Sequence, residues 1–593
     1  MTTHPNPADR AVPDSASAGT TSPLTRRDLG KLAAMGVAAV AASASPPGIA
    51  DAHAPASPPS VRSAPLRQTE ATPLAMSDAT ISPDVMNSIA TPPQLETSLG
   101  SLSFTDGIPS AETASTVYDY LDLMHGVEVF LNAYQGASTQ ALAQGLAAGG
   151  VPMNTVVIYQ ELMDASSLFL TANADTIYFM SIIDLTNGPM VVETPPRSLG
   201  LFDDMWFRWI IDFGNSGPDR GEGGKFLLLP PGYDGDLPDA GYYVGHSGTT
   251  RALLLGRQFL DAGDPAPAVA RIKDATRIYP YVPGGFGTSI ATVLEGKVPL
   301  APVATPQTPQ FIEATGAVVN TVPASDFTYF EQINALVQAE PATAFDPELM
   351  GQMAAIGIVK GKDFAPDERM RKILTDAAAI GAASARTLAF RPRASEGFEV
   401  YPGSGWINPL WLGGYTFETP PPMVTPQGIE PLPPTGARTL NARTAFFYTA
   451  TGVTPSMIMR LTGTGSQYLY GLYDADKQYF DGGKTYTVTL PPDIPEANFW
   501  SLTVYDTQTR SMLSTPQRYP RAGSQDFPSP AAVADADGST TIWFSPEQPA
   551  GVERGNWIQT VPGKGWFVLL RLYSPTAAFF DKTWQPSEIT LVD

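Results

Sequence analysis

The chain has 593 residues and a formal net charge of −22, from 36 Lys and Arg against 58 Asp and Glu. This acidic balance argues against binding to nucleic acid or to an anionic lipid surface, so neither is predicted as a partner. The chain has no cysteine and only four histidines, which rules out a Cys nucleophile, Cys-ligated zinc and an iron–sulfur cluster and disfavours a His-rich metal site.

The N-terminus has the pattern of a bacterial export signal. Arg26 and Arg27 precede an apolar, Ala-rich run over 32–44, and a small-residue cleavage pattern follows at 50–52. Paired arginines before a moderately apolar run are typical of a twin-arginine signal. The run is shorter than the roughly 18 apolar residues that a membrane-spanning helix needs.

This pattern predicts a signal peptide over 1–52, cleaved between Ala44 and Ala54. The twin-arginine translocase is then a partner during export, and the mature protein is periplasmic or secreted, without a stable membrane anchor. A retained N-terminal anchor and a disordered basic tail are the alternatives. Residues 53–80 are rich in Pro, Ser, Thr and Ala, which predicts a disordered linker.

The region 81–309 is predicted to be a first β-sandwich domain that begins with helices. Apolar residues at helical spacing predict a helix over 117–131, and a second short helix is expected over 138–147, ended by Gly149 and Gly150. Short apolar or aromatic runs separated by turn residues then follow, which is typical of a β-sandwich. These runs cover 156–159, 190–192, 206–213, 226–229 and 242–244.

Helical periodicity returns over 310–391, which is predicted to be a helical bridging segment. Ser325 is expected to cap one helix. A longer helix is expected to start near Pro366, with Pro in its first turn and with Asp367 and Glu368 favoured by the helix dipole.

Residues 392–442 are rich in Pro and Gly and are predicted to form a connection. A second β-sandwich domain is predicted over 443–593, because short strand-like runs return there. The sequence therefore predicts a mainly β fold with helical insertions, in which two β-sandwich domains are bridged by a helical segment. The strand-like runs of the second domain cover 468–473, 486–490, 500–505, 540–544, 566–573 and 589–592.

Several segments carry a resemblance to two families. The C-terminal part resembles the domain-of-unknown-function family numbered 1214, in YLYGLYD at 468–474, FWSLTVYD at 499–506 and PGKGWF at 562–567. The N-terminal part resembles the family numbered 1254, in NADTIY at 173–178 and GNSGPDRG at 214–221. The resemblance implies an immunoglobulin-like and a jelly-roll-like sandwich in one chain, and it implies no particular chemistry.

Four residues are predicted to be catalytic: Asn173, Asp175, Tyr178 and Arg251. If 173–178 is a strand, Asn173 and Asp175 share one face. The four side chains would then converge in a cleft as a polar ligand contact or a general base. The alternative is an Asx turn, in which Asn or Asp binds local backbone N–H groups.

A Gly-rich loop over 214–225 supplies the first predicted ligand-binding residues. Asp219, Arg220 and Lys225 belong to this loop, whose backbone N–H groups are suited to an anion. The alternative is a long hairpin connection whose glycines adopt positive φ angles.

Asp506 and Arg510 are also predicted to bind a ligand, or else to form an ion pair that locks the end of the strand at 500–505. Arg571 and Tyr573, two residues apart on one predicted strand, carry the same two interpretations. Several aromatic residues either stack on sugars or fill the core of the sandwich. They are Trp500, Tyr505, Trp543, Trp557, Trp566 and Trp584.

No cofactor and no metal site are predicted, although Ca²⁺ bound between Asp474 and Asp481 is an open alternative to a simple hairpin turn. Two functions follow from the sequence. The first is a hydrolase of an extracellular small molecule, glycan or polymer, because a polar cluster in an otherwise apolar exported chain is costly unless it is used. The second is a non-catalytic ligand-binding or cell-envelope protein.

Overall fold

The structure is a computed structural model that describes residues 81–412, 414–419, 423–425, 428–430, 435, 437–458 and 461–592. The predicted signal peptide, with Arg26 and Arg27, and the predicted linker lie outside these residues. The chain divides into two units, 1–88 and 89–593. The described part of the first unit, 81–88, holds most of helix α2 (Pro83–Ile89). Across the described ranges, no helix combines the length and apolarity needed to cross a membrane.

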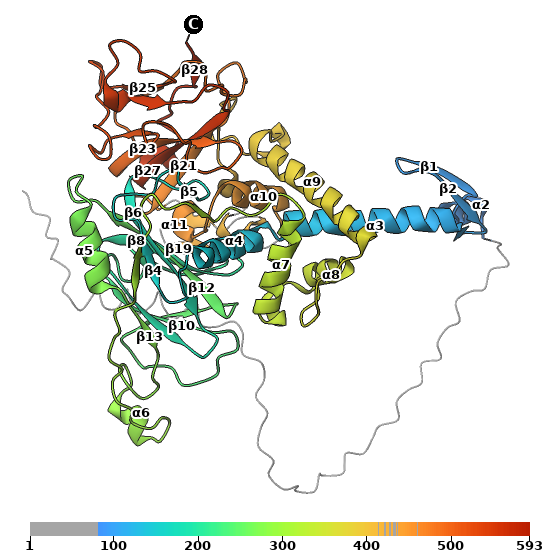
Figure 1. The fold of residues 1–593 in the computed structure, drawn as a ribbon, viewed down its shortest axis with the longest axis horizontal. Helices are drawn as coiled ribbons and strands as arrows, with labels where there is room; N and C mark the ends of the chain where they lie inside the picture. The colour runs from blue at the N-terminus through green and yellow to red at the C-terminus, as the bar shows by residue number, and fades with distance from the viewer. Residues whose placement is uncertain are drawn as a thin grey trace, which may run out of the picture. The chain divides into compact units, whose positions relative to one another are not determined.

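The second unit mixes sheets with helical insertions (Figure 1). It starts with a small sheet of β1 (Gln94–Thr97), β2 (Gly100–Thr105) and β3 (Ile108–Pro109), followed by α3 (Ala111–Asn132) and α4 (Tyr134–Ala148). Helix α3 is longer than predicted because Ser110 caps it, accepting a hydrogen bond from the backbone N–H of Thr113 at 3.2 Å. Helix α4 ends at Gly149, as the sequence predicts.

Two sheets follow these helices. The large N-terminal sheet has the order β14-β4-β6-β12-β8-β9, and the small N-terminal sheet has the order β11-β10-β7-β13. The ring of Phe202 on β8 lies 5.6 Å from that of Phe226 on β10, so the two sheets pack face to face. The strands are β4 (Val156–Ile158), β6 (Thr176–Asp184), β7 (Met190–Thr194), β8 (Ser198–Asp204), β9 (Trp209–Gly214), β10 (Gly224–Leu229), β11 (Tyr243–His246), β12 (Arg251–Phe259), β13 (Arg277–Pro280) and β14 (Phe311–Glu313).

Three central strands of the large N-terminal sheet, β6, β8 and β12, are absent from the predicted runs. Strand β8 is buried along its whole length, and β6 is buried except at its last residue. A strand covered on both faces lacks the alternation of polar and apolar residues that marks a half-exposed strand. The same region also contains β5 (Ser167–Leu168), α5 (Ala266–Ala275), α6 (Ile290–Leu294) and β15 (Val319–Asn320).

Helices α7 (Thr328–Ala339), α8 (Pro347–Ala355) and α9 (Glu368–Phe390) form the predicted helical segment and lie beside α3 (Figure 1). Gly126 of α3 permits the close approach of α9, because a Cβ at this position would lie 2.7 Å from the Cβ of Ala377. The predicted helix starts need correction. Asp367, and not Pro366, begins the last helix as its cap, and Asp326 rather than Ser325 accepts the bond from the N–H of Thr328.

The predicted connection holds short strands and leads into two more helices. Helix α10 (Leu440–Thr449) crosses the boundary that was predicted at 442/443, and α11 (Pro455–Ile458) follows it. The short strands are β16 (Trp406–Ile407), β17 (Glu418–Thr419), β18 (Met423–Thr425), β19 (Gly428–Glu430) and β20 (Ala437–Arg438).

Two further sheets complete the chain. The large C-terminal sheet has the order β16-β21-β27-β23-β24, and the small C-terminal sheet has the order β26-β25-β22-β28. Phe544 on β25 stacks on Trp566 of β27 with ring centroids 4.9 Å apart, so these sheets also pack together. The elements are β21 (Ser466–Gly471), β22 (Tyr486–Leu490), β23 (Glu496–Asp506), β24 (Arg521–Gly523), β25 (Thr540–Ser545), β26 (Trp557–Gln559), β27 (Trp566–Pro575), α12 (Ala577–Phe580) and β28 (Thr590–Leu591).

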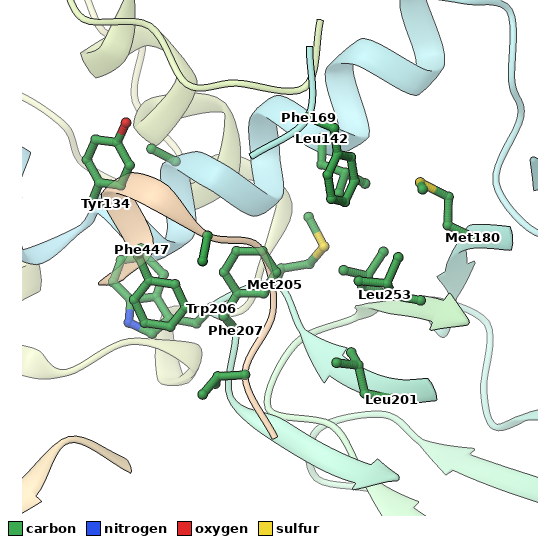
Figure 2. Close-up of a cluster of buried hydrophobic side chains, with 14 of the residues drawn as sticks. Tyr134, Leu142, Phe169, Met180, Leu201, Met205, Trp206, Phe207, Leu253 and Phe447 are labelled. Carbon is green, nitrogen blue, oxygen red and sulfur yellow. The ribbon is translucent and has the colours of Figure 1, made fainter. Parts of the chain in front are cut away.

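One hydrophobic core joins the N-terminal sheets, the helices and one face of the large C-terminal sheet. Figure 2 shows part of it, where Phe207 and Phe447 stack with ring centroids 5.4 Å apart and planes 5° apart. A second core lies between the two C-terminal sheets. The aromatic residues considered for sugar stacking are mostly core residues: Trp500, Tyr505, Trp557, Trp566 and Trp584 are buried.

Candidate functional site

A cavity of about 50 Å³ is lined by strands of both the large N-terminal sheet and the large C-terminal sheet. Cross-strand pairing sets its polar side chains in place. Tyr178 on β6 pairs with Arg257 on β12, and Tyr468 on β21 pairs with Arg571 on β27. The other lining residues are Phe169, Leu170, Thr171, Asn173, Leu201, Leu255, Phe446, Ala450, Thr451, Met457, Tyr470 and Leu569.

Arg571 is almost completely buried, with 2% of its surface exposed. Its Nη2 donates a hydrogen bond of 2.6 Å to the backbone oxygen of Thr171. Its Nη1 is buried and has no hydrogen-bond partner among the described residues. The guanidinium centre lies 5.5 Å from the ring centroid of Tyr505 and 5.9 Å from that of Tyr468. One strong donor of the cavity is therefore unused.

Arg257 is the second guanidinium group of the cavity and is partly buried. Its Nη1 lies 3.5 Å from the phenol oxygen of Tyr468. Burial lowers the pKa of Arg257, but Tyr468, Tyr178 and Tyr573 raise it, and the net shift is upward, so the side chain stays charged. Over the described part of the chain, neither Arg257 nor Arg571 forms an ion pair with a carboxylate.

Tyr468 differs from the other tyrosines of the cavity. Its phenol oxygen lies 2.5 Å from the Oγ of Ser466. Burial raises the pKa of Tyr468, but the charge of Arg257, hydrogen bonds with Ser466 and Arg257, and the charge of Arg571 lower it, and the net shift is downward. Burial raises the pKa of Tyr178, and it raises that of Tyr470 to about 12.

Asp175, the central predicted catalytic residue, forms a closed ion pair. Its Oδ1 lies 2.8 Å from the Nε of Arg521 on β24, and both side chains have no exposed surface. Its Oδ2 accepts a hydrogen bond of 2.6 Å from the Oγ of Ser501 on β23. Both carboxylate oxygens are thus occupied inside the protein, and Asp175 is not among the residues that line the cavity.

Arg251 pairs with Glu340 and not with Asp175. Its Nε lies 2.7 Å from the Oε1 of Glu340, whose side chain is fully buried. Arg251 opens β12 opposite Asp184, whereas the end of β12, at Phe259, pairs with Thr176 next to Asp175. Asp175 and Arg251 therefore sit at opposite ends of the β6–β12 pair. The expected single cleft around Asp175 and Arg251 is a wrong prediction, because each charge finds a different buried partner.

Asn173 adopts the Asx turn that was the alternative interpretation. Its Oδ1 accepts hydrogen bonds from the N–H of Asp175 at 3.0 Å and of Thr176 at 3.1 Å. Strand β6 starts only at Thr176, so the expected shared strand face of Asn173 and Asp175 does not exist. The Nδ2 of Asn173 nevertheless donates to the Oη of Tyr178 at 3.0 Å, and both side chains line the cavity.

The charged residues of the Gly-rich loop have structural partners or are exposed. Asp219 accepts hydrogen bonds from the N–H groups of Gly214 at 2.7 Å and Gly223 at 3.2 Å, while Arg220 is exposed. Lys225 forms an ion pair with Glu193. These contacts fit the hairpin-connection interpretation, and the loop contributes no residue to the cavity between the large sheets.

Asp506 and Arg510 do not form the expected ion pair. The Oδ2 of Asp506 lies 2.9 Å from the Nζ of Lys564. The guanidinium of Arg510 lies over the ring of Tyr448, 4.2 Å from its centroid, and donates to the Oη of Tyr134 at 3.0 Å. Each residue therefore has a structural partner, and neither lines the cavity.

The segment from Asp474 to Asp481 is a hairpin turn. The Oδ1 of Asp474 accepts hydrogen bonds from the N–H groups of Asp476 at 3.0 Å and Gln478 at 2.8 Å. In the ranges that the structure describes, no three His, Asp or Glu side chains come together in a way that could hold a metal ion. Calcium binding in this segment stays the open alternative that the sequence left.

Sequence reasoning missed Arg257 and Tyr468. Arg257 follows an apolar run over 252–255, and a charged residue that continues a buried strand was the available signal. Tyr468 stands in a segment that carries the family resemblance, and no local pattern there marks its phenol as a reactive group. The sequence marks Arg571 as a candidate, but it does not show that Arg257 and Tyr468 line the same cavity.

Next to the cavity, two buried carboxyl groups hold the segment that follows α10. The Oδ2 of Asp203 accepts a hydrogen bond from the N–H of Val453 at 3.1 Å, and that of Asp212 accepts one from the Oγ1 of Thr454 at 3.1 Å. Burial raises the pKa of Asp212 to about 7, although hydrogen bonds from Trp209, Thr454 and Ser456 lower it. Burial likewise raises the pKa of Asp203.

Family models match two parts of the chain. A model described as a protein of unknown function, DUF1254, matches residues 153–280, and one described as a protein of unknown function, DUF1214, matches residues 465–577. Tyr178 and Arg257 belong to the first part, and Tyr468 and Arg571 belong to the second. The cavity is thus built by both matched parts.

A comparison with curated proteins finds no match. Among solved structures, the VPA0106 protein from Vibrio parahaemolyticus is 16% identical, with 80% of this chain and 100% of that chain covered and a TM-score of 0.45. An uncharacterised protein from Burkholderia cenocepacia is 11% identical, with 82% and 97% covered and a TM-score of 0.34. The two family models match the chain in the order DUF1254 and then DUF1214, which is the order that the sequence predicted.

Proposed function

We propose that this protein binds a small organic carboxylate in the cavity between its two large sheets. The observation that carries this proposal is the pair of guanidinium groups, Arg257 and Arg571, in a cavity whose lining includes no carboxylate. Arginine presents paired N–H donors in the geometry that a carboxylate accepts.

The charge of the cavity supports an anionic ligand. A buried charge is costly unless a partner offsets it. Arg521 has Asp175, Arg251 has Glu340 and Lys225 has Glu193. Arg257 and Arg571 form no direct ion pair in the described ranges, although the charge of Asp175 acts on Arg571 and Arg257 acts on the charge of Asp212. The unused Nη1 of Arg571 is the donor that a bound carboxylate would satisfy.

The size and walls of the cavity support a short acid. A water molecule needs at least about 10–15 Å³ of such space, so 50 Å³ holds only a few non-hydrogen atoms. Leu201, Leu255 and Leu569 are among the apolar residues of the lining. A ligand with one carboxylate and a short apolar tail matches both.

Calorimetric titration of the full chain tests the proposal. Propionate is expected to bind, and propionamide, which has nearly the same shape but no charge, is not. Arg571→Met removes a hydrogen bond to a charged group, worth about 1.5–3 kcal/mol, so the affinity for propionate should fall at least about tenfold. Arg393→Gln, at an exposed arginine outside the cavity lining, is the matched control. Equal binding of the acid and the amide, or no binding of either, would contradict the proposal.

A hydrolase of a larger extracellular molecule is the second candidate. A groove of about 720 Å³ is also lined by residues of both large sheets, with Phe259 from β12 and Phe499 from β23. Its exposed polar residues include Asn215, Asn498 and Asp526. Such a mixture of aromatic and polar groups suits a glycan. Release of reducing sugars from a panel of polysaccharides would support hydrolysis, and its absence would leave the binding function.

Two further expectations are part of the proposal. We propose that the protein acts in the periplasm or outside the cell, after twin-arginine export. We also propose that the two sheet pairs have the immunoglobulin-like and jelly-roll-like forms, because the resemblance to the two matched families implies them.

A further inference from the structure

We propose that Tyr468 is an acid–base catalytic residue, which takes a proton from the carbon next to the carboxylate of the bound acid. This inference rests on the proposed function, because it needs the carboxylate to lie between Arg257 and Arg571. It adds a reaction to a site that is otherwise only a binding cavity.

The position of the phenol oxygen is the first argument. Tyr468 lines the cavity from β21, directly opposite Arg571 in the strand pairing. Its oxygen lies 3.5 Å from the Nη1 of Arg257 and 2.5 Å from the Oγ of Ser466. Two positive charges and a hydroxyl group lie around one phenol, and a phenolate is stabilised there when the hydroxyl donates to it.

The other lining groups are poorer bases. Tyr178 accepts hydrogen bonds from Asn173, through Nδ2 at 3.0 Å and the backbone N–H at 3.3 Å, and burial raises its pKa. Burial raises the pKa of Tyr470 to about 12. Tyr468 is the one tyrosine of this lining whose pKa is lowered, despite burial, by Arg257, Ser466 and Arg571.

The proton transfer balances without another reactant. The C–H bond next to the carboxylate breaks, and the proton forms the O–H bond of Tyr468. The electron pair of the C–H bond moves into the carboxylate, which gives an enediolate whose added charge faces Arg257 and Arg571. Return of a proton from Tyr468 to the same carbon restores the acid, so the cycle exchanges that hydrogen with solvent.

Ser466 is a positioning residue in this scheme. It is buried and is not among the residues that line the cavity, so a ligand there does not reach its hydroxyl. A hydrogen bond from this hydroxyl to the oxygen of Tyr468 favours the phenolate and fixes its direction.

Absorbance near 295 nm, where phenolate absorbs, gives the first test. The full chain should show one tyrosine that ionises at lower pH than the others, and Tyr468→Phe should remove this step. Tyr470→Phe, two residues away on the same strand and in the same lining, should retain it. An identical titration of the wild type and of Tyr468→Phe would overturn the inference.

Exchange of the hydrogen on the carbon next to the carboxylate gives the second test. Propionate and malonate are incubated with the protein in D₂O, and NMR measures the deuterium that they incorporate. The wild type should incorporate deuterium next to the carboxylate at least tenfold faster than Tyr468→Phe, while the variant still binds propionate. Equal rates, or no exchange above that of a protein-free sample, would overturn the catalytic role. If propionate binds but does not exchange, only this inference fails. If propionate does not bind at all, the proposed function fails first.

Discussion

The carboxylate of Asp175 and the guanidinium of Arg521 meet at 2.8 Å with no exposed surface on either side chain, although 346 positions of sequence separate them. Asp175 stands just before β6 of the large N-terminal sheet, and Arg521 opens β24 of the large C-terminal sheet. The pair therefore joins the segment matched by DUF1254 to the segment matched by DUF1214.

Breaking this pair is expected to destabilise the whole protein. Removal of one partner leaves an uncompensated buried charge, which costs about 3–5 kcal/mol. Asp175→Asn and Arg521→Met should each lower the free energy of unfolding by about this amount. Denaturant unfolding of the full chain measures it. The double variant should lose less than the sum of the two single losses, and a strictly additive loss would show that the pair is not coupled.

Stability should fall with rising pH through the titration of Asp212. Burial raises the pKa of this carboxyl from its usual value near 4 to about 7. The unfolded chain therefore loses its proton at lower pH than the folded chain does, so the contribution of Asp212 is complete below about pH 4 and is lost as the pH rises through 7. The largest possible effect is about 4 kcal/mol, at 1.36 kcal/mol per pKa unit.

The comparison of wild type with Asp212→Asn isolates this effect. Urea midpoints between pH 5 and 8.5 should decline more steeply for the wild type than for the variant, because the amide has no proton to lose in this range. Parallel profiles would mean that Asp212 is already ionised in the folded protein, or that a neighbouring carboxyl such as Asp203 carries the titration.

Gly256 should tolerate no side chain. It lies on β12 next to Arg257, and a Cβ there would overlap the ring of Phe179 on β6. Overpacking of this kind costs about 1–3 kcal/mol, so Gly256→Ala should lower the melting temperature and also weaken propionate binding. Gly351 of α8 has open space around its Cβ position, so Gly351→Ala should stabilise the helix by up to about 1 kcal/mol. A neutral Gly256→Ala would show that Phe179 can move aside.

Export is expected to depend on Arg26 and Arg27. Replacement of both by Lys keeps the charge but removes the paired arginines of the twin-arginine signal. Cell fractionation should then find the uncleaved precursor in the cytoplasm. Arg10→Lys, outside the paired motif, is the control and should leave export intact. Normal export of the double variant would contradict the twin-arginine prediction.

The sequence predicts the elements that have a repeating pattern or a turn signal. Helix α4 stops at Gly149 as expected. Strands β21, β22, β23, β25, β27 and β28 of the C-terminal sheets overlap the predicted runs, whereas β16, β24 and β26 do not. Strands β6 and β8 were not predicted, because a strand that is buried on both faces has no alternation of polar and apolar residues. Helix α10 was not predicted, because its residues from Thr444 to Thr449 are all buried and leave no polar face over that stretch, so the sequence lacks helical amphipathicity.

The candidate site was predicted only in part, for a different reason. Asn173 and Tyr178 are close in sequence, and the cavity does contain both. Their charged neighbours, Arg257 and Arg571, are far from them in sequence, and the sequence predicts Arg251 in their place. Arg251 and Arg257 lie on the same strand, β12, and only Arg251 pairs with a carboxylate, that of Glu340. Local sequence patterns cannot predict this difference, because strand register and sheet packing decide it.

The buried link between Asp175 and Arg521 also sets an order in time. Ribosomes add about 5–20 residues per second, so roughly 17–70 s pass between the synthesis of the carboxylate and that of its guanidinium across the 346 positions that separate them. Until then Asp175 has no counter-charge, and water must reach it. Burial of Asp175 is therefore expected to follow the synthesis of Arg521, which lies in the last quarter of the chain.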